Sequence, residues 1–213
     1  MPAIEARNIY KIFGRGADRA VERLRQGASR EDLRGEGITA AVIDASFEVE
    51  AGEIFVVMGL SGSGKSTLIR TINGLVMPAA GEMLVHGDDV ARASAAELRE
   101  IRSQRISMVF QHFALFPHRT VGENAAYGLR VKGMNRADRE AKARQALEMV
   151  GLSGWEASLP GQLSGGMRQR VGLARALAAG TDVLLMDEAF SALDPLIRRE
   201  MQDQLIELQA KLG

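Results

Sequence analysis

Residues 59–67 read Gly59-Leu60-Ser61-Gly62-Ser63-Gly64-Lys65-Ser66-Thr67 and follow the apolar run Ile54 to Met58. Their spacing fits the pattern G-x-x-x-x-G-K-[ST], which predicts a phosphate-binding loop between a strand and a helix. Glycines let backbone N–H groups approach phosphate oxygens, and the helix N-terminus adds unpaired N–H groups and its positive dipole end. Lys65 would reach the β- and γ-phosphates of a nucleotide, and the Ser66 hydroxyl would reach Mg²⁺. The expected phosphate contacts are Gly59, Ser61, Gly62, Ser63, Gly64, Lys65, Ser66 and Thr67.

Composition narrows the class of protein. The chain has 213 residues, 46% of them hydrophobic and 25% charged, so one domain with an inserted subdomain is sufficient. A net charge of +0 argues against a nucleic-acid partner, which normally requires a basic excess. Cysteine is absent, which excludes disulfides and thiolate metal sites and suits a reducing cytosol. No apolar leader follows Met1, and no stretch approaches the roughly 18 apolar residues of a membrane span.

The apolar patterning is typical of an α/β chain. Strands are predicted at residues 4–13, 38–49, 54–58, 81–85, 106–110 and 183–188. Helices are predicted after the phosphate loop and at 94–103, 135–150, 164–178 and 195–212. The polar segments 18–26 and 29–34 are helix-prone and are predicted to form an exposed insertion. The strand at 183–188 is apolar on both faces, as expected of a central parallel strand covered by helices.

That strand ends in two carboxylates, Asp187 and Glu188. Mg²⁺ prefers oxygen ligands, usually one or two carboxylates or hydroxyls completed by water and phosphate, so Asp187 and Ser66 suit a metal site. Glu188 suits a different role, that of polarising an attacking water. Lys65 would offset charge on the transferred phosphoryl group.

Two further motifs carry a family resemblance. Leu163-Ser164-Gly165-Gly166-Met167-Arg168-Gln169 resembles the signature motif of ABC-type ATPases, and Ser191-Ala192-Leu193-Asp194 resembles their D-loop. The resemblance implies a head-to-tail homodimer in which Ser164, Gly165, Gly166 and Asp194 of one chain close over ATP held by the other. Ser164 is placed to cap the helix, whose N-terminal dipole would face the γ-phosphate.

The same family assigns roles to two residues outside these motifs. Gln111 matches the Q-loop residue, whose side chain reaches Mg²⁺ and the attacking water and whose loop faces the membrane partner. Phe13 matches the aromatic residue that stacks on adenine, and Tyr10 competes for that role. A buried strand aromatic is the alternative reading of Phe13.

Within that family, the chain is similar to the ATP-binding subunits of glycine betaine and proline importers, in residues 10–14, 110–121 and 186–200. The resemblance implies a P-loop α/β fold with a mostly parallel core sheet, an N-terminal antiparallel β subdomain and a helical subdomain inserted at about 112–165. Residues 1–213 would form this single nucleotide-binding domain. A cytosolic ATPase docked on a permease at the inner membrane is implied, with the solute delivered by a separate extracytoplasmic binding protein.

Two features depart from the family pattern. Met167 replaces the glutamine common at the fifth place of the signature. The family also has a switch histidine one strand beyond the D-loop helix, but His86, His112 and His118 all lie too early, so a C-terminally truncated chain is expected. A soluble ABC ATPase of translation or DNA repair, and a fragment without ATPase activity, are the alternative functions. A small GTPase is disfavoured because no Asn-Lys-x-Asp motif occurs.

Overall fold

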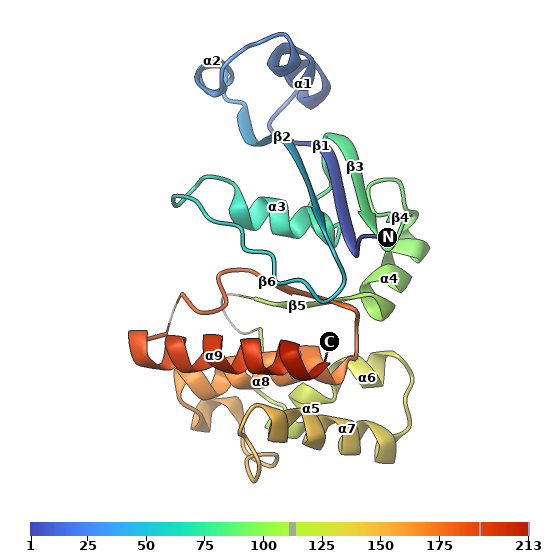
Figure 1. The fold of residues 1–213 in the computed structure, drawn as a ribbon, viewed down its shortest axis with the longest axis vertical. Helices are drawn as coiled ribbons and strands as arrows, with labels where there is room; N and C mark the ends of the chain where they lie inside the picture. Colours follow the sequence, from blue (N-terminus) through green and yellow to red (C-terminus); the bar gives the residue numbers. More distant parts are fainter. Residues whose placement is uncertain (111–113, 192, 213) are drawn as a thin grey trace. The chain divides into compact units, whose positions relative to one another are not determined.

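The computed structural model describes residues 1–110, 114–191 and 193–212 (Figure 1). The chain divides into two compact units, Met1–Arg102 and Ser103–Gly213. In the described part of the chain, no helix has both the length and the apolar character that crossing a membrane requires.

The first unit contains a four-stranded antiparallel sheet in the order β2-β1-β3-β4 (Figure 1). Its strands are β1 (Ile4–Phe13), β2 (Thr39–Val49), β3 (Ala80–Val85) and β4 (Asp88–Asp89). Strand β1 pairs with β2 along its length, from Ile4 opposite Val49 to Phe13 opposite Thr39. The strands predicted at 4–13, 38–49 and 81–85 are confirmed.

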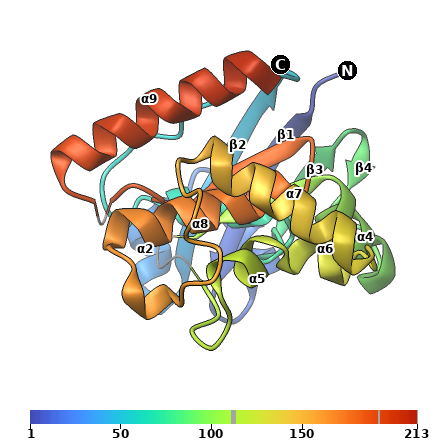
Figure 2. The same ribbon diagram turned by 90° about the horizontal axis from the view of Figure 1, so that it is seen from below.

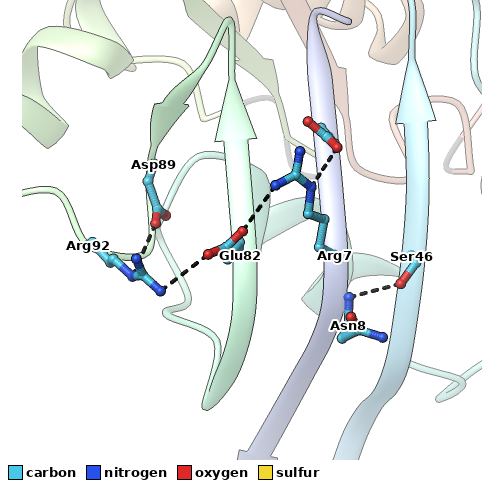
Figure 3. Close-up of polar contacts among 7 residues, drawn as sticks. Arg7, Asn8, Ser46, Glu82, Asp89 and Arg92 are labelled. Carbon is cyan, nitrogen blue, oxygen red and sulfur yellow. Dashed lines mark hydrogen bonds and ion pairs between the residues drawn. The ribbon is translucent and has the colours of Figure 1, made fainter.

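A bend in β1 sets the register of this sheet. Asn8 has φ 48°, and the pairing with β3 shifts between Arg7 and Tyr10. The backbone of β3 approaches so closely there that a Cβ on Gly81 would overlap the carbonyl oxygens of Arg7 and Asn8. The Asn8 N–H donates to the Ser46 hydroxyl at 2.8 Å (Figure 3). Glycine at position 81 is therefore required by both its φ of 98° and the close approach.

Charged side chains cross the face of the same sheet. In Figure 3, Glu82 lies between Arg7, at 3.3 Å, and Arg92, at 3.2 Å, and Arg92 also contacts Asp89 at 3.4 Å. Exposed ion pairs each contribute about 0–1 kcal/mol. The network therefore adds little stability, and the bend at Asn8 and the buried face define the sheet.

The segment between β1 and β2 forms two helices, α1 (Ala17–Arg25) and α2 (Arg30–Gly35). Ser29 caps α2 in a capping box with Asp32. Hydrogen bonds that Ser29 donates to the Asp32 carboxylate lower the pKa of that carboxyl group. The helices are not wholly an exposed insertion, because Ala20, Val21 and Leu33 are buried in one cluster with Tyr10. This packing covers one face of β1.

Helix α3 (Lys65–Ile72) follows the phosphate loop, and α4 (Ala95–Gln104) follows β4. The strand predicted at residues 54–58 is wrong, since these described residues lie outside every assigned strand. Ile54, Val56 and Met58 are 47%, 67% and 86% exposed. An apolar run shows only that a segment suits a buried strand, whereas a strand exists where neighbours complete its ladder.

The second unit contains a parallel pair of strands and a group of helices. Strand β5 (Ile106–Val109) pairs with β6 (Val183–Met186), from Ile106 opposite Val183 to Val109 opposite Met186. The helices are α5 (Val121–Ala125), α6 (Tyr127–Val131), α7 (Arg136–Met149), the 3-10 turn η1 (Pro160–Gln162), α8 (Gly165–Ala178) and α9 (Pro195–Leu212).

Helix α8 lies between α7 and α9 (Figures 1 and 2). Its buried residues Val171 and Leu173 share one core with Leu147 of α7 and with Met201 and Leu208 of α9. The helices predicted at 135–150, 164–178 and 195–212 are confirmed to within two residues. This core positions both the end of β6 and the start of α8.

Candidate nucleotide-binding site

The phosphate loop leads directly into α3. The Ser63 N–H donates to the Leu60 carbonyl at 3.2 Å, and the Leu68 N–H donates to the Gly64 carbonyl at 2.8 Å, which starts the helix. The Lys65 ammonium bends back over the loop and donates to the carbonyls of Gly59, at 3.0 Å, and Leu60, at 2.8 Å. The Lys65 side chain therefore lies over the phosphate loop, as the sequence pattern predicts. The next two residues, Ser66 and Thr67, are half-buried.

Two glycines of this loop have left-handed backbone, Gly62 with φ 77° and Gly64 with φ 102°. A Cβ on Gly64 would also overlap the carbonyl oxygen of Ala41 in β2. Successive N–H groups in such a turn form a concavity that suits an anion, and the N-terminus of α3 adds to it. The loop backbone therefore has the donor set that phosphate requires.

Phe13 and Tyr10 lie on opposite faces of β1. Tyr10 is 5% exposed and is packed under α1 and α2, whereas Phe13 is 44% exposed. The Lys11 ammonium lies 4.9 Å from the centre of the Phe13 ring. Phe13 pairs with Thr39 of β2. Gly64 approaches the carbonyl of Ala41, two positions farther along the same strand. At a rise of about 3.3 Å per residue, Thr39 and Ala41 lie about 7 Å apart. The structure thus brings the Phe13 end of β1 close to the phosphate loop within the first unit.

The two carboxylates after β6 occupy different environments. Asp187 is 1% exposed, and its N–H donates to the Val109 carbonyl of β5 at 3.1 Å. Glu188 is exposed and has φ 47°, a conformation that is uncommon in a non-glycine residue. Asp187 is therefore held inside the second unit, while Glu188 presents its carboxylate to solvent.

The turn that follows Glu188 is closed by hydrogen bonds. Ser191 donates to the Glu188 carbonyl from its N–H at 3.0 Å and from its hydroxyl at 2.8 Å. Asp194 caps α9, since its carboxylate accepts from the N–H groups of Leu196, at 3.2 Å, and Ile197, at 3.1 Å. Ala192 of the predicted D-loop lies outside the described residues.

Sequence reasoning missed Arg198. Its guanidinium donates to the carbonyls of Phe190, at 3.1 Å, and Leu193, at 2.9 Å. An arginine in the first turn of a helix opposes the helix dipole, and that unfavourable placement is the signal that would have identified it.

Ser164 caps α8 as predicted, its hydroxyl accepting from the Met167 N–H at 3.2 Å. Gly165 and Gly166 form the first turn, and a Cβ on Gly166 would lie 3.0 Å from the Ile197 side chain. Met167, which replaces the usual glutamine, packs against the hydrophobic core of this unit. The start of α8 therefore contacts the start of α9, next to the turn after β6.

Gln111 lies outside the described residues. The next described residue, Ala114, has φ 46°, and its carbonyl accepts a hydrogen bond of 2.7 Å from Arg175 of α8. Burial lowers the pKa of Arg175 from its usual value. Helix α8 thus anchors the chain where it returns from the predicted Q-loop.

The residues present fit Mg²⁺ and a nucleotide. The Ser66 hydroxyl and the Asp187 carboxylate are hard oxygen donors of the kind that Mg²⁺ shares with phosphate. Burial of a carboxylate to the extent seen at Asp187 is costly unless it is compensated. Ser66 and Asp187 therefore stay the predicted metal ligands together with Gln111, which lies outside the described residues.

Comparisons with known proteins identify the family of the chain. Residues 42–191 match the ABC transporter family. The chain is 57% identical to the glycine betaine/proline betaine transport system ATP-binding protein ProV of Escherichia coli, over 98% of this chain and 52% of that protein. It is 54% identical to the glycine betaine transport ATP-binding protein OpuAA of Bacillus subtilis, over 99% of this chain and 50% of that one.

A similar solved structure is the dimeric structure of MJ0796, described as a bacterial ABC transporter cassette. Its TM-score is 0.82 at 31% identity, over 99% of this chain and 84% of that one. The same cassette has been solved in a post-hydrolysis state bound to ADP and Pi, with the same TM-score of 0.82. The present chain spans about half the length of the two transport proteins it matches. Together with the phosphate loop and the capped signature helix, these matches show that the chain belongs to the ABC transporter family and has the fold of its ATP-binding cassette.

Proposed function

We propose that the chain is the ATP-hydrolysing motor subunit of an importer for glycine betaine, proline betaine or related compatible solutes. The observation that carries the proposal is the contrast between two adjacent carboxylates at the end of β6, Asp187 buried and Glu188 exposed. One carboxylate is suited to hold a metal and the other to act on a water. The names of the similar transport proteins support the solute class.

In this proposal the phosphate loop binds ATP through backbone N–H groups and Lys65. Ser66, Asp187 and Gln111 would hold Mg²⁺, which supplies charge neutralisation at the phosphates when bound. Glu188 orients the attacking water and accepts its proton, a role that typically contributes about 10² to 10⁴ in rate. Phe13 stacks on adenine, which its exposed ring supports better than the buried ring of Tyr10 does.

The proposed assembly is a homodimer with two ATP molecules between its subunits. Ser164, Gly165, Gly166 and Asp194 of one chain would close over the ATP of the other, and the dimeric state of the similar cassette supports this arrangement. The loop that carries Gln111 would face the permease. We place the subunit peripherally on the cytoplasmic side of the inner membrane, where a separate binding protein delivers solute from outside.

Glu188→Gln tests the hydrolytic role. We expect ATP binding to stay at the parent level and turnover to fall by about 10² or more, because the amide cannot accept the proton. Equilibrium binding of Mg-ATP and steady-state phosphate release measure the two quantities separately. Turnover of the variant near the parent rate would contradict the role given to Glu188.

The importer role needs a second measurement. The subunit is expected to copurify with a membrane permease, and reconstituted transport of radiolabelled glycine betaine should stop with Glu188→Gln. ATPase activity stimulated by nucleic acid, without an associated permease, would instead indicate a soluble ABC ATPase.

A further inference from the structure

Arg198 lies in the first turn of α9, three residues after Pro195. A cation at this end of a helix is disfavoured by the dipole, and the nearby Asp194 carboxylate caps the N–H groups of Leu196 and Ile197. The side chain turns instead to the loop before the helix, where Nε donates to Phe190 at 3.1 Å and Nη2 donates to Leu193 at 2.9 Å and to Ser191 at 3.4 Å. The position of Arg198 is thus explained by the turn and not by the helix.

The turn that Arg198 holds is the one that closes on Glu188. Ser191 offers its carbonyl to Arg198 and donates from its N–H and hydroxyl to the Glu188 carbonyl. Two successive contacts therefore connect the guanidinium to the backbone of Glu188. That backbone has φ 47°, a conformation that persists in a non-glycine residue only where its surroundings enforce it.

We propose that Arg198 is a positioning residue for Glu188, an inference that rests on the hydrolytic role proposed above. By fixing the carbonyls of Phe190, Ser191 and Leu193, the guanidinium holds the turn closed, and with it the backbone that carries the exposed Glu188 carboxylate. The planar guanidinium offers five N–H donors in a rigid fork, whereas a lysine ammonium is a flexible point charge. Lysine at this position would keep the positive charge but could not make the same set of hydrogen bonds to the three carbonyls.

Three variants of the purified protein test this inference: Arg198→Ala, Arg198→Lys and the control Arg199→Ala. Arg199 is the adjacent residue on α9 and is exposed. A displacement of about 1 Å at a reacting group can lower the rate about 10²-fold. We therefore expect kcat to fall about 10- to 100-fold in Arg198→Ala and less in Arg198→Lys. KM and equilibrium binding of Mg-ATP should change less than about twofold, and Arg199→Ala should keep the parent kcat.

A double-mutant cycle with Glu188→Gln identifies the residue through which Arg198 acts. Because Glu188→Gln already removes the positioned carboxylate, adding Arg198→Ala should lower kcat no further. This readout separates a positioning role from general destabilisation, which would lower activity in both backgrounds.

Several results would overturn the inference. They are parent-level kcat in both Arg198 variants, an equal fold-loss with and without Glu188→Gln, or a loss of Mg-ATP binding that matches the loss of kcat. If Arg198→Ala does not fold, Arg198→Lys carries the same test. Parent-rate hydrolysis by Glu188→Gln alone would refute the role of Glu188 and with it that of Arg198, whereas failure confined to the Arg198 variants leaves the proposed function intact.

Discussion

The phosphate loop and the turn after β6 both use left-handed backbone, but with different residues. The loop uses glycine, at Gly62 and Gly64, whereas the turn uses Glu188 at φ 47°. In the loop the backbone N–H groups are the binding groups, so a side chain would only obstruct them. In the turn the side chain is the proposed reacting group, so glycine cannot serve. The unfavourable conformation there is instead held by Ser191 and Arg198.

The largest expected effect is that of Gly64→Ala. The new Cβ would overlap the Ala41 carbonyl, and left-handed backbone costs a non-glycine residue about 1–2 kcal/mol. Overpacking against a carbonyl that cannot move adds about 1–3 kcal/mol. We expect the free energy of unfolding, measured by denaturant titration, to fall by the sum of these two costs. We also expect the stabilisation by Mg-ATP, measured by thermal shift, to be lost.

Gly62→Ala is the matched control. Its backbone is also left-handed, at φ 77°, but the added Cβ meets no atom within 4 Å. Only the conformational cost of about 1–2 kcal/mol should appear. If both variants lost the same free energy of unfolding, the close approach of Gly64 to β2 would not contribute to the effect of Gly64→Ala.

Glu188→Gly makes the opposite change in the turn. Turnover should fall about 10²-fold or more, because the reacting carboxylate is gone. Stability should stay the same or rise by up to about 1 kcal/mol, since relief of the left-handed conformation outweighs the extra freedom of glycine in the unfolded chain. Phosphate release and urea unfolding report the two effects, and a clear loss of stability would show that Glu188 is not strained.

Local patterns explain which parts were predictable. The loop at 59–67 and the Ser164 cap depend on residues within a few positions of one another, and both form. The helix predicted at 94–103 also forms, and Ser94 and Glu97 make a capping box at its start. The strand at 54–58 was wrong because its existence depends on partner strands that its own residues do not encode.

Long-range contacts account for the other failures. Sequence matched Phe13 to the adenine-stacking residue but left Tyr10 as a competitor, because the burial of Tyr10 depends on α1 and α2 packing over one face of β1. The hydrogen bonds of Arg198 to the preceding loop were missed because its side chain reverses direction along the chain. Spacing patterns record residue types at fixed offsets and contain no information on where a long side chain turns.

Ser164→Ala separates capping from catalysis in the second unit. Loss of a serine or threonine N-cap costs about 1 kcal/mol of stability, and Thr120→Ala in α5 removes an equivalent cap. Both variants should lose similar stability in thermal unfolding. Only Ser164→Ala should also slow ATP turnover, because it removes the proposed hydrogen bond to the charged phosphate. Such a bond contributes roughly 1.5–3 kcal/mol, and the activation free energy should rise by that amount. Equal turnover in the two variants would mean that Ser164 serves the helix alone.

The smallest effect is expected at Phe13, which is proposed to stack on adenine and takes no part in the chemistry at the phosphates. Aromatic stacking on a base contributes about 1–3 kcal/mol, and the exposed ring at 44% favours the low end. Phe13→Ala should weaken Mg-ATP binding accordingly and leave stability nearly unchanged, whereas Phe13→Tyr keeps a ring and should bind normally. Calorimetric titration of both variants, with Tyr10→Phe as a third, measures the affinities. If Tyr10→Phe weakened binding and Phe13→Ala did not, the buried face of β1 would have to open to admit adenine, and the packing of Leu33 and Ala20 over Tyr10 would then regulate access to the site.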